Sequence, residues 1–160
     1  MWSSEVTNMI ITGIWETLYM TLVSTLVGYV IGLPMGIILT VSDKDGIKPN
    51  AVLYKILDVI ANIVRSVPFI ILLVLLIPFT RLVVGKSYGS TATIVPLVIA
   101  AAPYIARMVE SSLKEVDAGV IEAARSMGAS NFTIITKVML VEARTSLLVG
   151  ATITLGTILG

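Results

Sequence analysis

The run LYMTLVSTLVGYVIGLPMGIILTV, Leu18 to Val41, decides the fold class of this chain. It contains no charged residue, and at about 1.5 Å per residue it is long enough, as a helix, to cross roughly 30 Å of hydrocarbon. The residues before it include Glu5 and Glu16 but no Lys or Arg, which excludes the basic leader of a secretory signal. We therefore expect a retained transmembrane helix.

Composition extends this interpretation to the whole chain. Hydrophobic residues make up 56% and charged residues 13% of the 160 positions, against about 25% charged residues in soluble domains. The net charge of +1 argues against nucleic acid as a partner. The chain has no Cys and no His, which excludes disulfides, thiolate or imidazole catalysis and the usual Cys/His metal sites, so we expect no metal. We predict an all-α fold, a polytopic membrane helical bundle.

Further apolar runs follow the first one, and together they predict a single transmembrane domain over residues 1–160. A polar insert separates the third run from the fourth, at about residues 108–145. The fourth run is still apolar at Gly160, so we expect the chain to be truncated at its C-terminus. The spans are expected at about residues 17–41, 66–84, 90–107 and 146–160.

Lys and Arg are unevenly distributed among the segments that connect these runs. The segments after the first and third runs together hold nine, whereas the segment after the second run holds only Arg81 and Lys86. Cationic loops tend to stay in the cytoplasm. We therefore predict an extracytoplasmic N-terminus and a cytoplasmic insert.

Three glycines recur at four-residue spacing in the first run. Gly28, Gly32 and Gly36 would line one helical face without side chains and allow another helix to approach closely. Glycine is also simply common in membrane helices, which is the alternative interpretation. The spacing leaves open whether the partner helix belongs to the same chain or to a second copy.

The insert contains the segment EAARSMGAS, Glu122 to Ser130. We expect a short helix from Asp117 to about Met127, with Gly128 in a left-handed conformation after it and Ser130 capping the next helix. One face of this helix is narrow and has mostly small side chains, which would let the helix dock in a groove of another protein. The alternative is a helix that lies on the lipid surface. This face is expected to contain Val120, Ala123, Ala124 and Met127.

These residues resemble the EAA signature of the membrane subunits of ABC importers. In that signature EAA is followed by three residues, Gly, nine residues and then Ile-x-Leu-Pro. Here Gly128 and the segment Val138 to Leu140 keep the spacing, and Val141 replaces the proline. The similarity extends over nearly the whole chain and is greatest to permeases of methionine importers, for example in NIVRSVPFIILLVLLIPFTRLVVG, Asn62 to Gly85.

The resemblance implies a fold, partners and a site. It implies an ABC importer permease in the bacterial inner membrane, working as a homodimer with cytoplasmic ATP-binding subunits, an extracytoplasmic substrate-binding protein and membrane lipid. The chain itself would bind no cofactor, since the partner subunit would use the ATP. Substrate-contacting residues are not indicated. The implied docking residues are Asp117, Val120, Ile121, Glu122, Ala123, Ala124, Met127 and Gly128.

Other functional classes share the apolar composition. A secondary transporter or channel subunit would more often place ionisable residues within its spans, where this chain is expected to have none. A membrane scaffold that binds a cytoplasmic partner without transport is a further alternative. ATP hydrolysis by the chain itself is excluded, because GKS at Gly85 to Ser87 lacks the first P-loop glycine, which Thr80 replaces.

Overall fold

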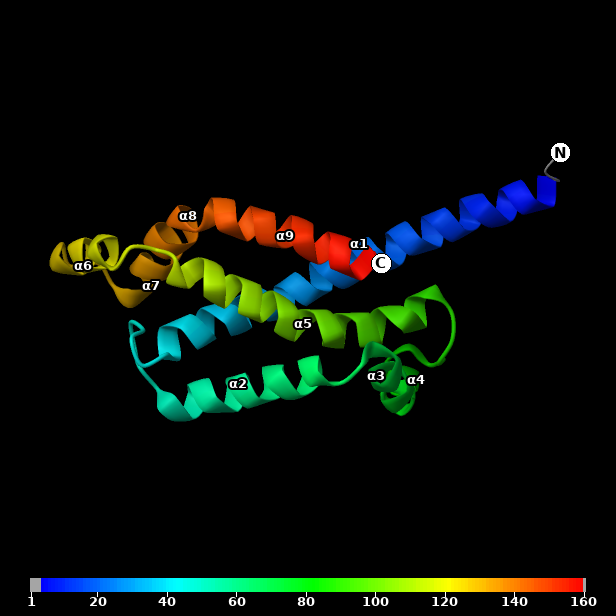
Figure 1. Ribbon diagram of the computed structural model, residues 1–160, viewed down its shortest axis with the longest axis horizontal. Coiled ribbons are helices and arrows are strands. Elements are labelled where there is room, and N and C mark those ends of the chain that lie inside the picture. The colour runs from blue at the N-terminus through cyan, green and yellow to red at the C-terminus, as the bar shows by residue number, and fades with distance from the viewer. Residues whose placement is uncertain (1–3, 160) are drawn as a thin grey trace.

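The computed structural model describes residues 4–159, which contain helices and no strand (Figure 1). This agrees with the predicted all-α fold. In chain order the elements are α1 (Ser4–Ser42), α2 (Ala51–Ser66), α3 (Phe69–Leu75), α4 (Ile77–Val84), α5 (Ser90–Lys114), α6 (Ala118–Ser126), α7 (Asn131–Thr133), the π-helix η1 (Ile134–Met139), α8 (Leu140–Glu142) and α9 (Arg144–Leu159).

The two longest helices, α1 and α5, are each long and apolar enough to cross a membrane. The span expected at 17–41 lies within α1, which begins thirteen residues earlier, at Ser4. The N-terminal part of α1 projects beyond the other helices (Figure 1), and its large side chains, such as Met9 and Trp15, are exposed.

The glycine face of α1 lies against α5 of the same chain. A Cβ placed on Gly32 would come within 2.7 Å of the Ala102 carbonyl oxygen, and one on Gly36 within 2.6 Å of the Ala106 carbonyl oxygen. Real Cβ atoms essentially never approach other heavy atoms this closely. The partner that the spacing left open is therefore α5, and the absence of side chains on α1 sets the distance between the two helices.

Helix α5 continues past the expected end of its span. The sequence placed that end at residue 107, but the helix runs to Lys114 and takes in the first seven residues of the expected insert. The charged residues that suggested a boundary do not interrupt the helix. They form ion pairs within the chain, which offset the cost of burying charge.

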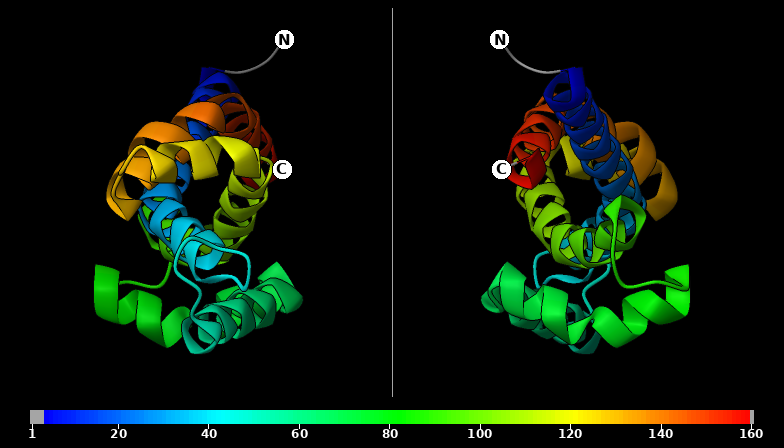
Figure 2. Two further views of the ribbon diagram at one scale, coloured as in Figure 1. Left: turned by 90° about the vertical axis from the view of Figure 1, so that its left-hand side faces the viewer. Right: turned by 90° about the vertical axis from the view of Figure 1, so that its right-hand side faces the viewer.

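Residues 66–84, expected as one span, instead form the short helices α3 and α4. The chain turns by 104° between α2 and α3, at Pro68, which cannot donate a backbone hydrogen bond. Viewed end-on, α2, α3 and α4 lie together on one side of α1, α5 and α9 (Figure 2). In this arrangement α2 and α3 together are apolar enough to form one bent span.

Helix α9, which contains most of the fourth expected span, packs against α1 and α5. The segment Asn131–Glu142 and α9 meet at an angle of 68°, at Ala143. The bend therefore forms without the proline of the EAA signature, which Val141 replaces. Ala143 itself is buried, and the hydroxyl of Ser146 donates a 2.9 Å hydrogen bond to that of Ser112 on α5.

Candidate coupling site

Helix α6 begins and ends where the sequence predicts. The Asp117 carboxylate accepts a 2.6 Å hydrogen bond from the Gly119 amide and caps the N-terminus. At the other end Gly128 has a φ of +81°, and its amide donates to the Arg125 carbonyl at 3.0 Å. Ser130 then caps α7 by accepting from the Thr133 amide. The positive φ favours glycine at position 128.

The two faces of α6 have different surroundings. Ala124 is 5% exposed and belongs to the hydrophobic core of this chain, with Leu113, Ile134 and Met139. Ile121 packs against the same core. We expected Ala124 to contact a partner protein together with Val120, Ala123 and Met127. That expectation is wrong for Ala124, which packs against its own chain. A helix this short is stable only when such packing anchors it.

The rest of the α6 surface, which we call its open face, is not covered by this chain. Met127 is 82% exposed and Val120 is 40% exposed, and Glu122 and Ala123 are also exposed. Phe132 of α7, which the sequence analysis did not single out, is 75% exposed beside them in the chain. Figure 1 shows α6 and α7 at one end of the molecule. An exposed apolar surface on a segment capped at both ends is typical of a protein interface.

A cavity of about 410 Å³ lies between α6, the end of α5 and the loop after α1. Its lining includes Glu122 and Arg125 of α6 and Asp43, Asp45 and Lys114 from the other two segments. The glutamate of the EAA segment thus borders a polar cavity of its own chain. This places the segment next to a cluster of ion pairs.

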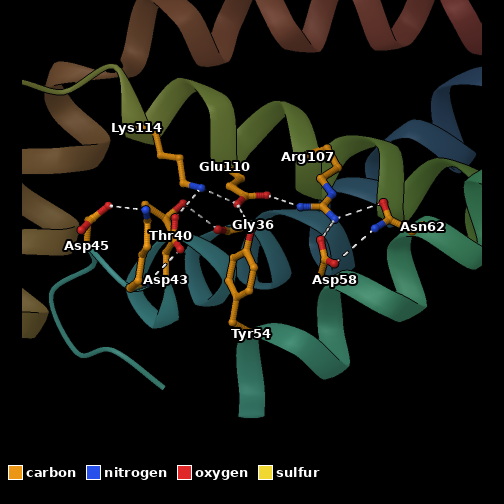
Figure 3. Close-up of polar contacts among 11 residues, drawn as sticks. Gly36, Thr40, Asp43, Asp45, Tyr54, Asp58, Asn62, Arg107, Glu110 and Lys114 are labelled. Carbon is orange, nitrogen blue, oxygen red and sulfur yellow. Dashed lines mark hydrogen bonds and ion pairs between the residues drawn. The ribbon is translucent and has the colours of Figure 1, made fainter. Parts of the chain in front are cut away.

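Glu110 is the centre of that cluster (Figure 3). Its carboxylate is nearly inaccessible and accepts from Arg107 Nη1 at 2.7 Å, from Lys114 Nζ at 2.8 Å and from the Tyr54 hydroxyl at 3.2 Å. A buried carboxylate is stable only with such partners. The two cations come from α5 itself, and Tyr54 comes from α2.

The outer members of the cluster join α5 to its neighbours. Arg107 pairs with Asp58 of α2, next to Asn62. Lys114 Nζ lies 2.6 Å from an oxygen of Asp43, which follows α1. The hydrogen bond from Lys114 lowers the pKa of Asp43 below its ordinary value, so this contact is present at neutral pH and is lost only at acid pH.

Sequence reasoning missed this cluster. Arg107, Glu110 and Lys114 are spaced at i, i+3 and i+7, a pattern that places them on one helical face. That signal was available, but it did not identify Asp43 and Asp58 as partners, because they lie on other helices. All three residues lie in the C-terminal part of α5, at or after the expected end of its span at residue 107.

With this geometry in place, comparison with known proteins identifies the family. Residues 32–160 match the family described as binding-protein-dependent transport system inner membrane component. The chain belongs to this family. Membership decides between the functional classes left open above, in favour of a permease subunit over a secondary transporter, a channel or a scaffold.

Curated relatives support the assignment. The chain is 54% identical over 152 residues to the D-methionine transport system permease protein MetI of Salmonella typhimurium, an alignment that covers 95% of this chain and 70% of that protein. The Escherichia coli protein of the same name is also 54% identical with the same coverage. A probable D-methionine permease of Vibrio cholerae is 46% identical over 157 residues.

Solved structures agree with the fold. An inward-facing structure of the MetNI methionine ABC transporter matches with a TM-score of 0.97 and 52% identity, over 99% of this chain and 74% of that one. An amino acid ABC transporter solved with histidines matches with a TM-score of 0.76 at 24% identity, which shows a shared fold only. This permease thus belongs to a family of inner membrane transport components and has the helical fold of the permease in the MetNI transporter.

Proposed function

We propose that this permease forms part of the path by which an ATP-driven importer carries methionine into the cell. The observation that carries the proposal is the identity of 54% to D-methionine permeases over 95% of the chain. In this proposal the complex contains a second copy of the chain and two ATP-binding subunits. A binding protein delivers the cargo from outside, and lipid surrounds the spans.

Coupling to the ATP-binding subunit is assigned to the open face of α6. Met127 and Val120, with Phe132 of α7, present apolar surface away from the core. Asp117 and Gly128 hold the helix ends in place. Ile121 and Ala124 fix α6 to α5 and η1, so that force on the open face is transmitted into the bundle. ATP is bound and hydrolysed in the partner, and the chain itself holds no cofactor.

Copurification and transport together test the proposal. The permease is expressed with its ATP-binding subunit, purified, and reconstituted with the binding protein in liposomes. We expect ATP-dependent methionine uptake by the parent complex. Met127→Ser should reduce both recovery of the ATPase and uptake severalfold, because Met127 is among the most exposed apolar residues of the segment. Exposed Leu82 of α4 supplies the control, since Leu82→Ser should leave both unchanged.

Orientation is tested separately. The chain has no cysteine, so a cysteine introduced at one position is the only thiol. With the N-terminus outside, Ser87→Cys should react with an impermeant thiol reagent added to intact cells, and Ser130→Cys should react only after lysis. The reverse pattern would place α6 outside the cell and contradict the coupling role.

A further inference from the structure

A second cavity, of about 480 Å³, lies where α2, α3, α5 and α9 meet. Most of its wall is apolar, with few polar side chains. This combination, within the usual range of about 300 to 1,000 Å³, is typical of small-molecule sites. Its lining includes Arg65, Phe69, Leu72, Leu97, Tyr104 and Thr157.

The cavity borders the middle of α5. Leu97 and Tyr104 lie seven and fourteen residues after the first residue of the 25-residue helix, about 10 and 21 Å along its axis. On the other side of the cavity, α2 ends at Ser66 and the chain turns by 104° into α3. Cargo sites of membrane transporters are commonly formed at such interruptions near the bilayer midplane.

Arg65 brings the only charge to this cavity among the residues that line it. The cations of α5 are already engaged, Arg107 by Asp58 and Glu110 and Lys114 by Asp43 and Glu110. Within residues 4–159, by contrast, Arg65 has no ion pair and no side-chain hydrogen bond. A guanidinium with free donors beside an apolar cavity is suited to a carboxylate, which it can bind through two parallel hydrogen bonds.

The remaining polar groups suit the other end of an amino acid. Thr157 donates its hydroxyl hydrogen to the Ile153 carbonyl at 2.9 Å, so its oxygen can still accept from an ammonium group. The Tyr104 hydroxyl can accept as well. Phe69, Leu72 and Leu97 provide an apolar surface for a thioether or other uncharged side chain.

We propose that this cavity is a transient site for the transported amino acid, with Arg65 binding its α-carboxylate. The inference rests on the proposed function, since it names the contact residues of the same import path. It also gives Arg65 a role beyond that of a cation at the membrane surface. A second cation, Arg81, flanks the same apolar run but does not line the cavity, and provides the matched control.

Protection of a single thiol tests occupancy of the cavity. In the assembled complex, Leu97→Cys is alkylated with and without methionine, and with methioninol, in which a hydroxymethyl group replaces the carboxylate. We expect methionine to slow the labelling about 10-fold and methioninol to have little effect. A thiol at Leu82, 83% exposed on α4 and outside the cavity lining, should be labelled at one rate throughout.

Substitution of Arg65 completes the test. Arg65→Gln should abolish the protection by methionine, Arg65→Lys should retain part of it, and Arg81→Gln should retain it fully. Recovery of the ATP-binding subunit with each variant shows that the complex still assembles. If Arg65→Gln disrupts assembly, Arg65→Lys with its reduced protection carries the test.

Each failure has its own signature. A parent complex that imports methionine but gives no protection at position 97 overturns the cavity proposal and leaves the proposed function standing. Equal protection by methioninol, or full protection in both Arg65 variants, overturns the carboxylate contact. A parent complex that imports no methionine contradicts the proposed function whatever the labelling shows.

Discussion

The contact between α1 and α5 at Gly28, Gly32 and Gly36, which we call the seam, and the end of the short helix α6 both depend on glycine, but for different physical reasons. In the seam, Gly32 and Gly36 have no side chain because backbone atoms of α5 occupy the space where one would begin. After α6, a Cβ on Gly128 would meet nothing within 4 Å, and only the φ of +81° favours glycine. One region needs room between helices, and the other needs a backbone conformation.

Surface exposure separates the two regions further. The seam is buried within the chain, and substitutions there should act on stability. Helix α6 is divided, with Ala124 buried like a seam residue and Met127 exposed on the open face. A larger side chain at Ala124 should therefore displace α6 from its own chain, rather than from a partner as the sequence suggested. Four substitutions compare residues that stabilise this chain with residues exposed on α6. They are ordered from the largest expected loss of stability to the smallest.

The largest loss is expected in the seam. Gly36→Val places a side chain 2.6 Å from both Val109 Cβ and a backbone oxygen, so the free energy of unfolding should fall by about 3 kcal/mol. Gly28→Ala should cost less than Gly36→Ala, because its closest contact is the flexible end of Ile105. Thermal unfolding in detergent measures both. Gly13→Val is the control, because a Cβ at this position would meet nothing within 4 Å. Equal losses of stability at positions 13 and 36 would contradict the close packing of α1 against α5.

The ion cluster beside the seam comes next. Glu110→Gln removes the charge that holds Arg107 and Lys114 at 2.7 and 2.8 Å. We expect a loss of about 2 kcal/mol, reduced from a fully buried pair because Lys114 is partly exposed. Asp45→Asn should change stability little, since its pair with Lys44 is 84% exposed on both sides. Combining Glu110→Gln with Lys114→Met should cost less than the sum of the two single changes.

The backbone requirement at Gly128 should have a smaller effect. Gly128→Val forces a β-branched residue to a φ of +81°, at a cost of about 1 kcal/mol or slightly more, and should weaken the coupling segment locally. Gly128→Asn should cost less, because Asn tolerates this conformation. Hydrogen exchange of the α6 amides provides the measurement. Equal exchange in both variants would show that conformation is not the reason for glycine here.

The smallest change in stability is expected on the open face of α6. Met127→Ser should alter the free energy of unfolding by less than about 0.5 kcal/mol, because the side chain is 82% exposed. Uptake should nevertheless fall, as proposed above, since the lost contact belongs to the partner. A large drop in unfolding temperature would mean that Met127 supports this chain instead.

Local patterns predicted much of the coupling segment. Asp117, Gly128 and Ser130 act within a few residues of themselves, so their types were enough to predict the helix ends. The side on which α6 is buried was not predictable in the same way. The core that covers Ala124 comes from α5, η1 and the start of the bend at Ala143, segments whose positions depend on the whole fold.

The same distinction applies to the entire chain. Apolar runs and their lengths by themselves predicted a helical membrane protein, because a helix pairs its own backbone groups in the bilayer and about 20 apolar residues are needed to cross it. The glycine spacing predicted that another helix could approach α1 closely, without excluding that these glycines reflect only the composition of membrane helices. Only the tertiary structure decided that α5 is the helix that packs on these glycines, that the chain turns by 104° between α2 and α3, and that Asp43 and Asp58 meet Lys114 and Arg107. These contacts join residues far apart in sequence, and the energy of each depends on packing and burial that local sequence does not contain.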